Sequence, residues 1–129
     1  SYGSTLNLVI DSIPEFDDLG IDVEIIDIQT LIPFDLGKEI LLSVKKTNRV
    51  IIIDEDVPGG ASSYILHKLI DEQGIFNYLD SSPKTLTAKD HRPPYGTDGD
   101  YFSKPSVDDI VESVYNIMNE SNPNQYPPL

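Results

Sequence analysis

The sequence has 129 residues, a length that one domain with a buried core accounts for. Its 22 acidic and 9 basic side chains give a net charge of −13 and a pI near 4.2. Such a surface repels phosphate backbones, which argues against nucleic acid as a ligand and favours a basic protein partner. An acidic surface kept for solubility explains the same charge, and both explanations remain open.

Other properties narrow the class of protein further. The chain has no cysteine, which excludes disulfides and thiolate chemistry. No apolar stretch is long enough to span a membrane, and no secretory signal is visible at the start of the sequence. We therefore expect a cytoplasmic protein that does not associate with membranes.

The start of the chain predicts a helix followed by a strand. Apolar spacing indicates a helix from Ser4 or Thr5 to Asp18, which Pro14 kinks or shortens. Residues 22–28 alternate between polar and apolar side chains, a pattern that only Ile26 breaks, and so predict a strand.

A second helix is predicted between this strand and the next. Asp35 is a suitable N-cap for a helix through Lys46, and Asn48 can supply a left-handed cap at its end. The side chains expected on its buried face are Leu36, Ile40, Leu41 and Val44.

The apolar run at residues 50–53 is the strongest strand pattern in the chain. Four β-branched aliphatic residues in a row indicate a strand that is buried on both faces. Gly59 and Gly60 then open a helical pattern that extends to about Gln73, and residues 83–88 predict a shorter strand.

The last third of the chain contains a long connection and a final helix. Residues 89–104 are rich in Pro, Gly and Asp, and loops of this length are usually functional or packed on a neighbour. Ser106 and Asp109 form a capping-box pattern at the start of the last helix. Residues 120–129 are polar and Pro-rich, so we expect one domain over residues 1–119 and a flexible tail.

Helices and strands alternate along the whole chain. This order predicts a three-layer α/β/α sandwich with right-handed crossovers and helices on both faces of the sheet. Three strands make a narrow sheet, and a strand lying before Ser1 would complete it.

Three acidic residues, Asp54, Glu55 and Asp56, follow the central strand, at the edge where α/β proteins often carry their sites. They suit a divalent cation or the phosphoacceptor site of a receiver domain. The receiver pattern is otherwise missing, because no strand ends on a correctly ordered hydroxyl and lysine. The favoured interpretation is that these acids cap loop amides and the following helix.

His91, next to Arg92 in the long connection, is the other candidate for chemistry. No Ser or Cys nucleophile in a recognisable motif accompanies it, so packing of the loop is favoured over catalysis. His67 lies mid-helix, on the face expected to point outward, and Gly59 and Gly60 are too few for a dinucleotide fingerprint. We assign no catalytic, cofactor-binding or metal-binding residue from these patterns.

Four ordered blocks of sequence resemble one known family. They are residues 20–27 with 30–35 (Thr-Leu-Ile-Pro-Phe-Asp), residues 39–47 with Arg49-Val50, Gly59-Gly60 opening a helix, and residues 105–111. In this order they resemble the C-terminal domain of transketolase-like enzymes. The closest resemblance is to the beta subunit, or an alpha/beta fusion, of thiamine diphosphate-dependent 2-oxoacid dehydrogenases. One departure is Asp54, where family members often have a His.

The resemblance implies a mixed, mostly parallel sheet whose first strand ends in the segment Tyr2-Gly3-Ser4 and is truncated here. It also implies that thiamine diphosphate and Mg²⁺ belong to the full-length enzyme, not to this domain. The motif Gly-Asp-Gly followed by a distant Asn, which binds that cofactor, is absent from the sequence. The domain alone is therefore predicted to be inactive.

The implied function is a non-catalytic domain of the decarboxylating component, of pyruvate or branched-chain type. It would contact upstream domains or an alpha subunit, a homodimer or heterotetramer mate, and the subunit-binding domain of the acyltransferase core. From charge and position, the acids expected to meet that last partner are Asp71, Glu72, Asp80, Asp108, Asp109 and Glu112. The alternatives are a stand-alone regulatory or ligand-binding module using residues 54–60, and the equivalent domain of a transketolase or deoxyxylulose-phosphate synthase.

Overall fold

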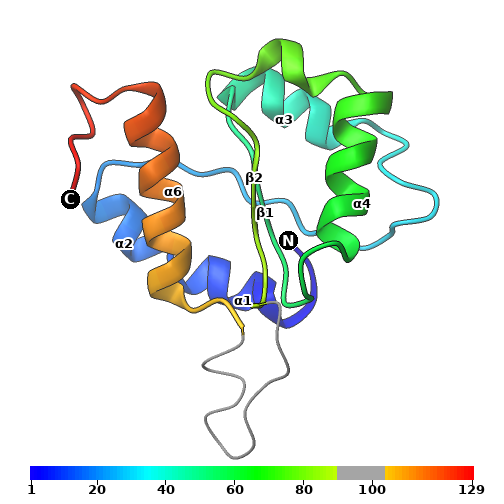
Figure 1. Ribbon diagram of the computed structural model, residues 1–129, viewed down its shortest axis with the longest axis horizontal. Helices are drawn as coiled ribbons and strands as arrows, with labels where there is room; N and C mark the ends of the chain where they lie inside the picture. Colours follow the sequence, from blue (N-terminus) through cyan, green and yellow to red (C-terminus); the bar gives the residue numbers. More distant parts are fainter. Residues whose placement is uncertain (90–103) are drawn as a thin grey trace, which may run out of the picture.

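A short parallel sheet lies at the centre of the protein (Figure 1). A computed structural model describes residues 1–89 and 104–129 of the chain. Strand β1 (Ile51–Ile53) pairs in parallel with β2 (Lys84–Leu86), so that Ile51 lies opposite Lys84 and Ile53 opposite Leu86. These strands fall within the predicted strands at residues 50–53 and 83–88.

Helices cover both sides of these strands, which makes the fold α/β. Figure 1 shows α1, α2 and α6 on one side and α3 and α4 on the other. In chain order the helical elements of the described residues are α1 (Gly3–Asp11), α2 (Ile13–Asp18), α3 (Glu39–Thr47), α4 (Ala61–His67), the π-helical turn η1 (Lys68–Glu72), the 3-10 turn η2 (Ile75–Tyr78) and α6 (Val107–Ser121). Within the described ranges, no helix is both long and apolar enough to cross a membrane.

The apolar core divides into two clusters because neighbouring residues of β1 point to opposite faces. Ile53 packs into what we call the α6-side cluster and Ile52 into the α4-side cluster, and each side chain is 4% exposed. The buried members of the α6-side cluster are Val9, Phe16, Ile21, Ile53, Ile110, Tyr115 and Tyr126. Those of the α4-side cluster are Ile40, Val44, Ile52, Ile65, Leu69 and Ile75.

The helix ends predicted from local sequence are confirmed at two places. Asn48 ends α3 in the left-handed region, with φ 61°, and its N–H donates to Val44 O at 2.8 Å. At the start of α6, Ser106 Oγ accepts from the Asp109 N–H at 3.1 Å, and Asp109 Oδ2 accepts from the Ser106 N–H at 2.9 Å. This reciprocal pair is the predicted capping box.

The predicted helix up to Asp18 is interrupted near Pro14, as expected from that residue. The segment forms two helices, α1 and α2, which meet at Ser12, and Pro14 lies in the first turn of α2. Proline is tolerated there because the amides of a first turn have no intrahelical partner, whereas it interrupts a helix interior. The helix also begins earlier than expected, at Gly3.

The second helix begins later than predicted. Both carboxylate oxygens of Asp35 accept from backbone amides, Glu39 N–H at 2.8 Å and Ile40 N–H at 3.2 Å, so Asp35 does cap the helix. The intervening residues form a turn, however, and α3 starts only at Glu39. Leu36 therefore lies outside the helix and is 80% exposed, so its predicted burial was wrong.

The predicted strand at residues 22–28 is not a strand in the structure. The segment carries no regular secondary structure, and the backbone groups of residues 22–25 make no hydrogen bond with other backbone groups of the described chain. Its neighbouring apolar residues still point to opposite sides, with Ile25 packed against the α6-side cluster and Ile26 against the α4-side cluster, whereas Val23 is exposed. What the segment lacks is a neighbouring strand along its length.

The predicted flexible tail at residues 120–129 makes specific contacts in the structure. Helix α6 continues to Ser121, and Tyr126 is 7% exposed. The Tyr115 hydroxyl donates to Pro127 O at 2.6 Å, and the Asn119 side chain donates to Tyr126 O at the same distance. The end of the chain thus covers part of the α6-side cluster.

The burial of β1 on both faces leads to the first testable prediction. Ile52→Asp should unfold the domain, because an unpaired charge in the α4-side cluster costs several kcal/mol. Leu42→Asp is the matched control, since Leu42 is 61% exposed and its substitution should leave the fold intact. Circular dichroism and denaturant unfolding measure both. A soluble Ile52→Asp protein with a cooperative, native-like transition would contradict the prediction.

Candidate functional site

The carboxyl end of β1 places a buried acid at the edge of the sheet. The backbone N–H of Asp54 donates to Leu86 O at 2.9 Å, which extends the strand pairing by one residue and turns its side chain inward. The Asp54 side chain is 1% exposed. Its Oδ1 accepts from the Asp56 N–H at 3.2 Å, while Oδ2 is buried without a hydrogen-bond partner. An unpaired buried carboxylate oxygen is costly, so this position is unusual among the described residues.

Tyr2 lies beside this carboxylate. Burial raises the pKa of the Tyr2 phenol to about 12, and the neighbouring Asp54 carboxylate adds to the effect, with smaller contributions from Asp56 and Glu55. All these causes disfavour the phenolate, by desolvation, by the interaction of the phenol O–H with the Asp54 carboxylate, or by charge repulsion. Tyr2 is therefore a neutral donor facing an acidic end of the sheet.

Glu55 connects three parts of the chain at the same end of the sheet. Its Oε2 accepts from Ser4 Oγ at 2.7 Å and lies 3.4 Å from Lys104 Nζ. The hydrogen bond from Ser4, together with the charge of Lys104, lowers the pKa of Glu55. Because Ser4 belongs to α1 and Lys104 precedes α6, Glu55 ties the start of both helices to the end of β1.

The rest of the acidic loop is shaped by its own backbone contacts. Asp56 Oδ1 accepts from the Val57 N–H at 2.8 Å. Gly59 has φ +90°, a conformation that side chains rarely adopt, and a Cβ at Gly60 would collide with the Asp56 carboxylate. Asp54 and Asp56 thus accept from loop amides as the sequence favoured, but no side chain caps α4, so the expected capping of the following helix is not observed. The two glycines serve the shape of the loop.

The other candidates for chemistry are a metal site and the two histidines. Among residues 1–89 and 104–129, no group of three His, Cys, Asp or Glu side chains could hold a metal ion. His67 is exposed and pairs with Asp71 at 3.2 Å on the outer side of α4. The other candidates, His91 and Arg92, lie outside the described residues.

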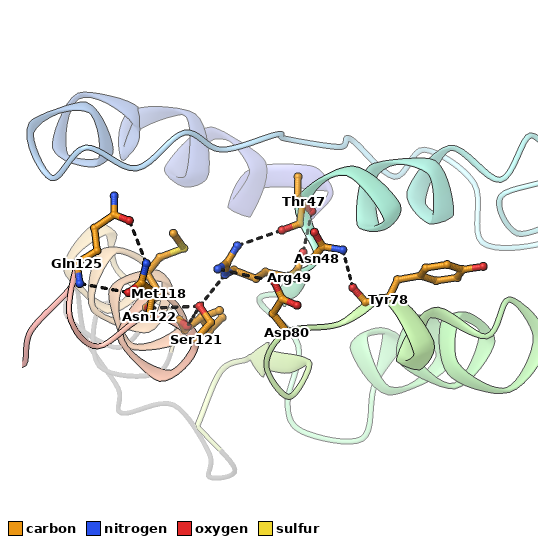
Figure 2. A network of polar contacts seen from close by, with 10 residues as sticks. Thr47, Asn48, Arg49, Tyr78, Asp80, Met118, Ser121, Asn122 and Gln125 are labelled. Atoms are coloured by element: carbon orange, nitrogen blue, oxygen red, sulfur yellow. Dashed lines mark hydrogen bonds and ion pairs between the residues drawn. The ribbon is translucent and has the colours of Figure 1, made fainter.

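A polar network at the opposite end of β1 was not predicted from the sequence. Arg49 precedes the strand, and its Nε donates to Ser121 Oγ at 2.7 Å, while Nη1 donates to Thr47 O at 3.2 Å (Figure 2). Nη2 lies 4.0 Å from Asp80 Oδ2. The network holds the end of α6 against the start of β1. The one signal for it in the sequence is an arginine directly before an apolar strand.

The six acids predicted to meet a basic partner fall into separate groups. Asp71 and Glu72 lie in η1, next to α4, whereas Asp108, Asp109 and Glu112 lie on α6 across the sheet (Figure 1). The remaining acid, Asp80, pairs with Arg49 between these groups. The structure therefore offers two acidic surfaces where the sequence suggested one. We call Asp71 and Glu72 the η1 surface, and the acids on α6 the α6 surface.

The two surfaces differ in how far their charges are already paired. On the η1 surface, Asp71 Oδ2 lies 3.2 Å from His67 Nδ1, which is an ion pair only when the imidazole is protonated, and Glu72 Oε1 accepts from Lys68 Nζ at 2.7 Å. On the α6 surface, Asp109 is engaged in the capping box. No ion pair of the described residues involves Asp108 or Glu112.

A shallow depression lies on the α6 surface. Its volume is about 410 Å³ and its lining includes Asp108, Glu112 and Glu15, an acid of α2 that sequence reasoning missed. Glu15 joins the other two because α2 and α6 both pack on the α6-side cluster. We call Glu15, Asp108 and Glu112 the α6 acidic surface.

Comparisons with known proteins match nearly the whole chain. The family described as "Transketolase, C-terminal domain" matches residues 1–110. The pyruvate dehydrogenase E1 component subunit beta of Rhizobium meliloti is 33% identical over 114 residues, which cover 88% of this chain and 24% of that protein. The protein of the same name from Mesostigma viride is 36% identical over 110 residues, covering 85% of this chain and 33% of that protein.

A relative with a different name matches as well. The acetoin:2,6-dichlorophenolindophenol oxidoreductase subunit beta of Bacillus subtilis is 30% identical over 120 residues, covering 93% of this chain and 34% of that protein. The chain thus spans about a quarter to a third of the length of these relatives.

The raised pKa of Tyr2 gives a prediction about stability at high pH. The pKa of the Tyr2 phenol is about 12 in the folded state and about 10 in the unfolded state. This difference stabilises the folded state below about pH 10, and the stabilisation is lost as the pH rises through about 12. Tyr2→Phe should therefore flatten the fall in unfolding free energy between about pH 10 and about pH 12. Denaturant unfolding across that range measures it.

Two further variants make this prediction specific. Asp54→Asn removes a charge beside the phenol, so the pKa of Tyr2 should fall while burial keeps it above the ordinary value. Tyr78→Phe, which removes an exposed phenol, is the matched control. Ultraviolet titration of tyrosinate in the three variants separates their contributions. Identical titration curves for Tyr2→Phe and Tyr78→Phe would contradict the assignment.

Proposed function

Because the chain belongs to the transketolase C-terminal domain family, we propose that it is the C-terminal, non-catalytic domain of the decarboxylating component of a 2-oxoacid dehydrogenase. The observation that carries this proposal is the alignment of 85% to 88% of the chain with subunits named pyruvate dehydrogenase E1 beta. The substrate is a 2-oxo acid of pyruvate or branched-chain type. In the full-length enzyme, the domain assembles with upstream domains or an alpha subunit and with a homodimer or heterotetramer mate.

The proposed architecture is a three-layer sandwich around a mixed, mostly parallel sheet. Its support is the division of the core, since Ile52 and Ile53 pack into clusters on opposite faces. We still predict that the domain comprises residues 1–119 and that residues 120–129 form a tail.

The described residues do not fit thiamine diphosphate with its Mg²⁺. A diphosphate and a divalent cation need several oxygen ligands at one place. The acids at the end of β1 are instead engaged with loop amides, Ser4 and Lys104. We propose that the cofactor, which supplies the decarboxylation chemistry, is held by other parts of the full-length enzyme.

This proposal predicts that the isolated chain binds no thiamine diphosphate. Calorimetric titration with thiamine diphosphate and Mg²⁺ should give only the heat of dilution, and a decarboxylation assay should show no activity. A titration in excess chelator is the control, since binding of this cofactor depends on the metal. Saturable heat that disappears with chelator would contradict the proposal.

Docking to the acyltransferase core is the second part of the proposed function. We place it at the α6 acidic surface, because Asp108, Glu112 and Glu15 form none of the ion pairs of the described chain and border one depression. A basic subunit-binding domain can neutralise these charges without first breaking an internal pair. The η1 surface is the weaker candidate, since His67 and Lys68 already face its acids.

Paired charge reversals test which surface docks. Glu15→Lys with Glu112→Lys should slow association with the acyltransferase subunit-binding domain by about tenfold, because exposed charges steer encounter. Asp71→Lys with Glu72→Lys is the matched control and should change the rate little. Surface plasmon resonance at two salt concentrations measures both, and wild-type association should weaken with salt since the Debye length is about 8 Å at physiological ionic strength.

Two results would count against this docking site. Association that does not depend on salt would mean that the net charge of −13 serves solubility. A slower rate in the η1 variant with an unchanged rate in the α6 variant would move the docking site across the sheet. Circular dichroism of both variants shows that the fold is retained.

A further inference from the structure

The outer side of α3 carries exposed apolar side chains together with two lysines. Leu42, on α3, is 61% exposed, and Leu36, in the turn that leads into this helix, is 80% exposed. Lys38 and Lys45 lie four residues before and three residues after Leu42, so these three residues follow one side of the helix. Tyr78 of η2, which is 40% exposed, lies beside Lys45. We call Leu36, Lys38, Leu42, Lys45 and Tyr78 the α3 outer face.

The two lysines of the α3 outer face form no ion pair within residues 1–89 and 104–129. Most of the other basic side chains in these ranges lie within 4.0 Å of a carboxylate, namely Lys46, Arg49, Lys68, Lys84 and Lys104. Lys38 and Lys45 have no such neighbour, although acidic side chains outnumber basic ones by 22 to 9 in the sequence. They therefore leave a positively charged surface that a carboxylate of another molecule can reach.

Lys45 is held in position by its neighbours. Its Nζ lies 5.1 Å from the centroid of the Tyr78 ring. Asn48 Nδ2 donates to Tyr78 O at 2.8 Å, which ties η2 to the end of α3 (Figure 2). A cation–π contact at an exposed site is weak, and the ammonium group has three donors, so Lys45 can still bind a carboxylate. Because the lysine is ordered beforehand, less conformational entropy is lost when that carboxylate binds.

The spacing along the α3 outer face matches a second helix lying beside α3. Lys38 and Lys45 are seven residues apart, which corresponds to about two helical turns, or roughly 10 Å. Carboxylates at positions i and i+7 of a partner helix have the same separation. An apolar side chain at position i+4 of that helix then lies opposite Leu42.

The charge of the chain and the apolar side chains of this face favour a protein as the partner. A net charge of −13 repels the phosphates of nucleic acids and of anionic lipids. Single exposed apolar side chains are common on protein surfaces, whereas several on one face mark an interaction site. A helix with both carboxylates and an apolar side chain on one side complements both properties of the α3 outer face.

We propose that the α3 outer face docks an acidic amphipathic helix of a partner protein, with two carboxylates paired to Lys38 and Lys45 and an apolar side chain between them packed on Leu42. Figure 1 shows α3 and α6 on opposite sides of the sheet, so this surface is separate from the α6 acidic surface. Its partner is acidic, whereas the partner proposed for the α6 acidic surface is basic. The proposal depends neither on docking to an acyltransferase nor on the substrate.

A designed peptide is the probe that tests this proposal. Its sequence is acetyl-Gln-Ala-Ala-Glu-Ala-Ala-Gln-Leu-Ala-Ala-Glu-Ala-Ala-Gln-amide, which places Glu, Leu and Glu at i, i+4 and i+7 of an alanine-rich helix. A control peptide has Gln in place of both Glu residues. Amide NMR spectra of the isotope-labelled chain follow each titration, with the variants Lys45→Glu, Leu42→Asp and Lys84→Glu. Lys84→Glu is the matched control, because it makes the same change of charge on β2, where Lys84 Nζ lies 3.9 Å from Glu120 Oε2.

The acidic peptide should shift the amide signals of Lys38, Leu42, Lys45 and Tyr78, and the shifts should saturate at millimolar peptide. Lys45→Glu and Leu42→Asp should each weaken binding by about tenfold or more, since one places like charges opposite each other and the other removes the apolar contact. Lys84→Glu should change the affinity little, and the control peptide should bind at least about tenfold more weakly. Added salt should weaken binding of the acidic peptide, because it screens exposed charges. Circular dichroism shows that each variant is folded.

Three results would overturn the proposal. The absence of saturable shifts in these amides at millimolar peptide would mean that the α3 outer face is only a solvated surface. Equal binding of the acidic and control peptides would show that the lysines do not select the partner. Binding of the chain to phosphatidylserine vesicles that Lys45→Glu abolishes, without binding of the peptide, would assign the face to a lipid surface.

Discussion

The burial of β1 on both faces is the constraint on which the rest of the structure depends. Ile52 and Ile53 are adjacent, yet each is almost fully buried in a different cluster. Such a strand is stable only if helices cover both sides, and this requirement positions α6 and α1 on one face and α3 and α4 on the other. Arg49 and Glu55, at the two ends of the strand, then bind α6 and α1 to it through polar contacts.

Features of the fold that depend on a few adjacent residues were predicted correctly from the sequence. The capping box at Ser106 and the left-handed Asn48 were predicted from a few adjacent residues, and the four β-branched residues at 50–53 predicted a doubly buried strand. The predictions failed where the outcome depends on distant parts of the chain. Residues 22–28 have the side-chain alternation of a strand, but a strand also needs a partner, and periodicity does not reveal whether one is present.

The candidate site was predictable in composition but not in geometry. The sequence placed Asp54, Glu55 and Asp56 at a strand end, and the structure confirms that position. Burial separates their roles, since Asp54 is enclosed while Glu55 holds Ser4 and Lys104. Glu15 was missed because its relation to Asp108 and Glu112 arises from packing of α2 beside α6, which helical spacing within one segment does not encode.

Several buried side-chain atoms have no hydrogen-bond partner among the described residues, and some of them lie near the carboxyl end of β1. They include Ser1 Oγ and Asp54 Oδ2, and Ser62 Oγ at the start of α4, just beyond the acidic loop. A buried polar atom left unpaired costs about 1–3 kcal/mol, so a folded protein rarely leaves several of them together. In residues 1–89 and 104–129, the backbone amides of Ile51 and Ile53, which face away from β2, also have no backbone partner.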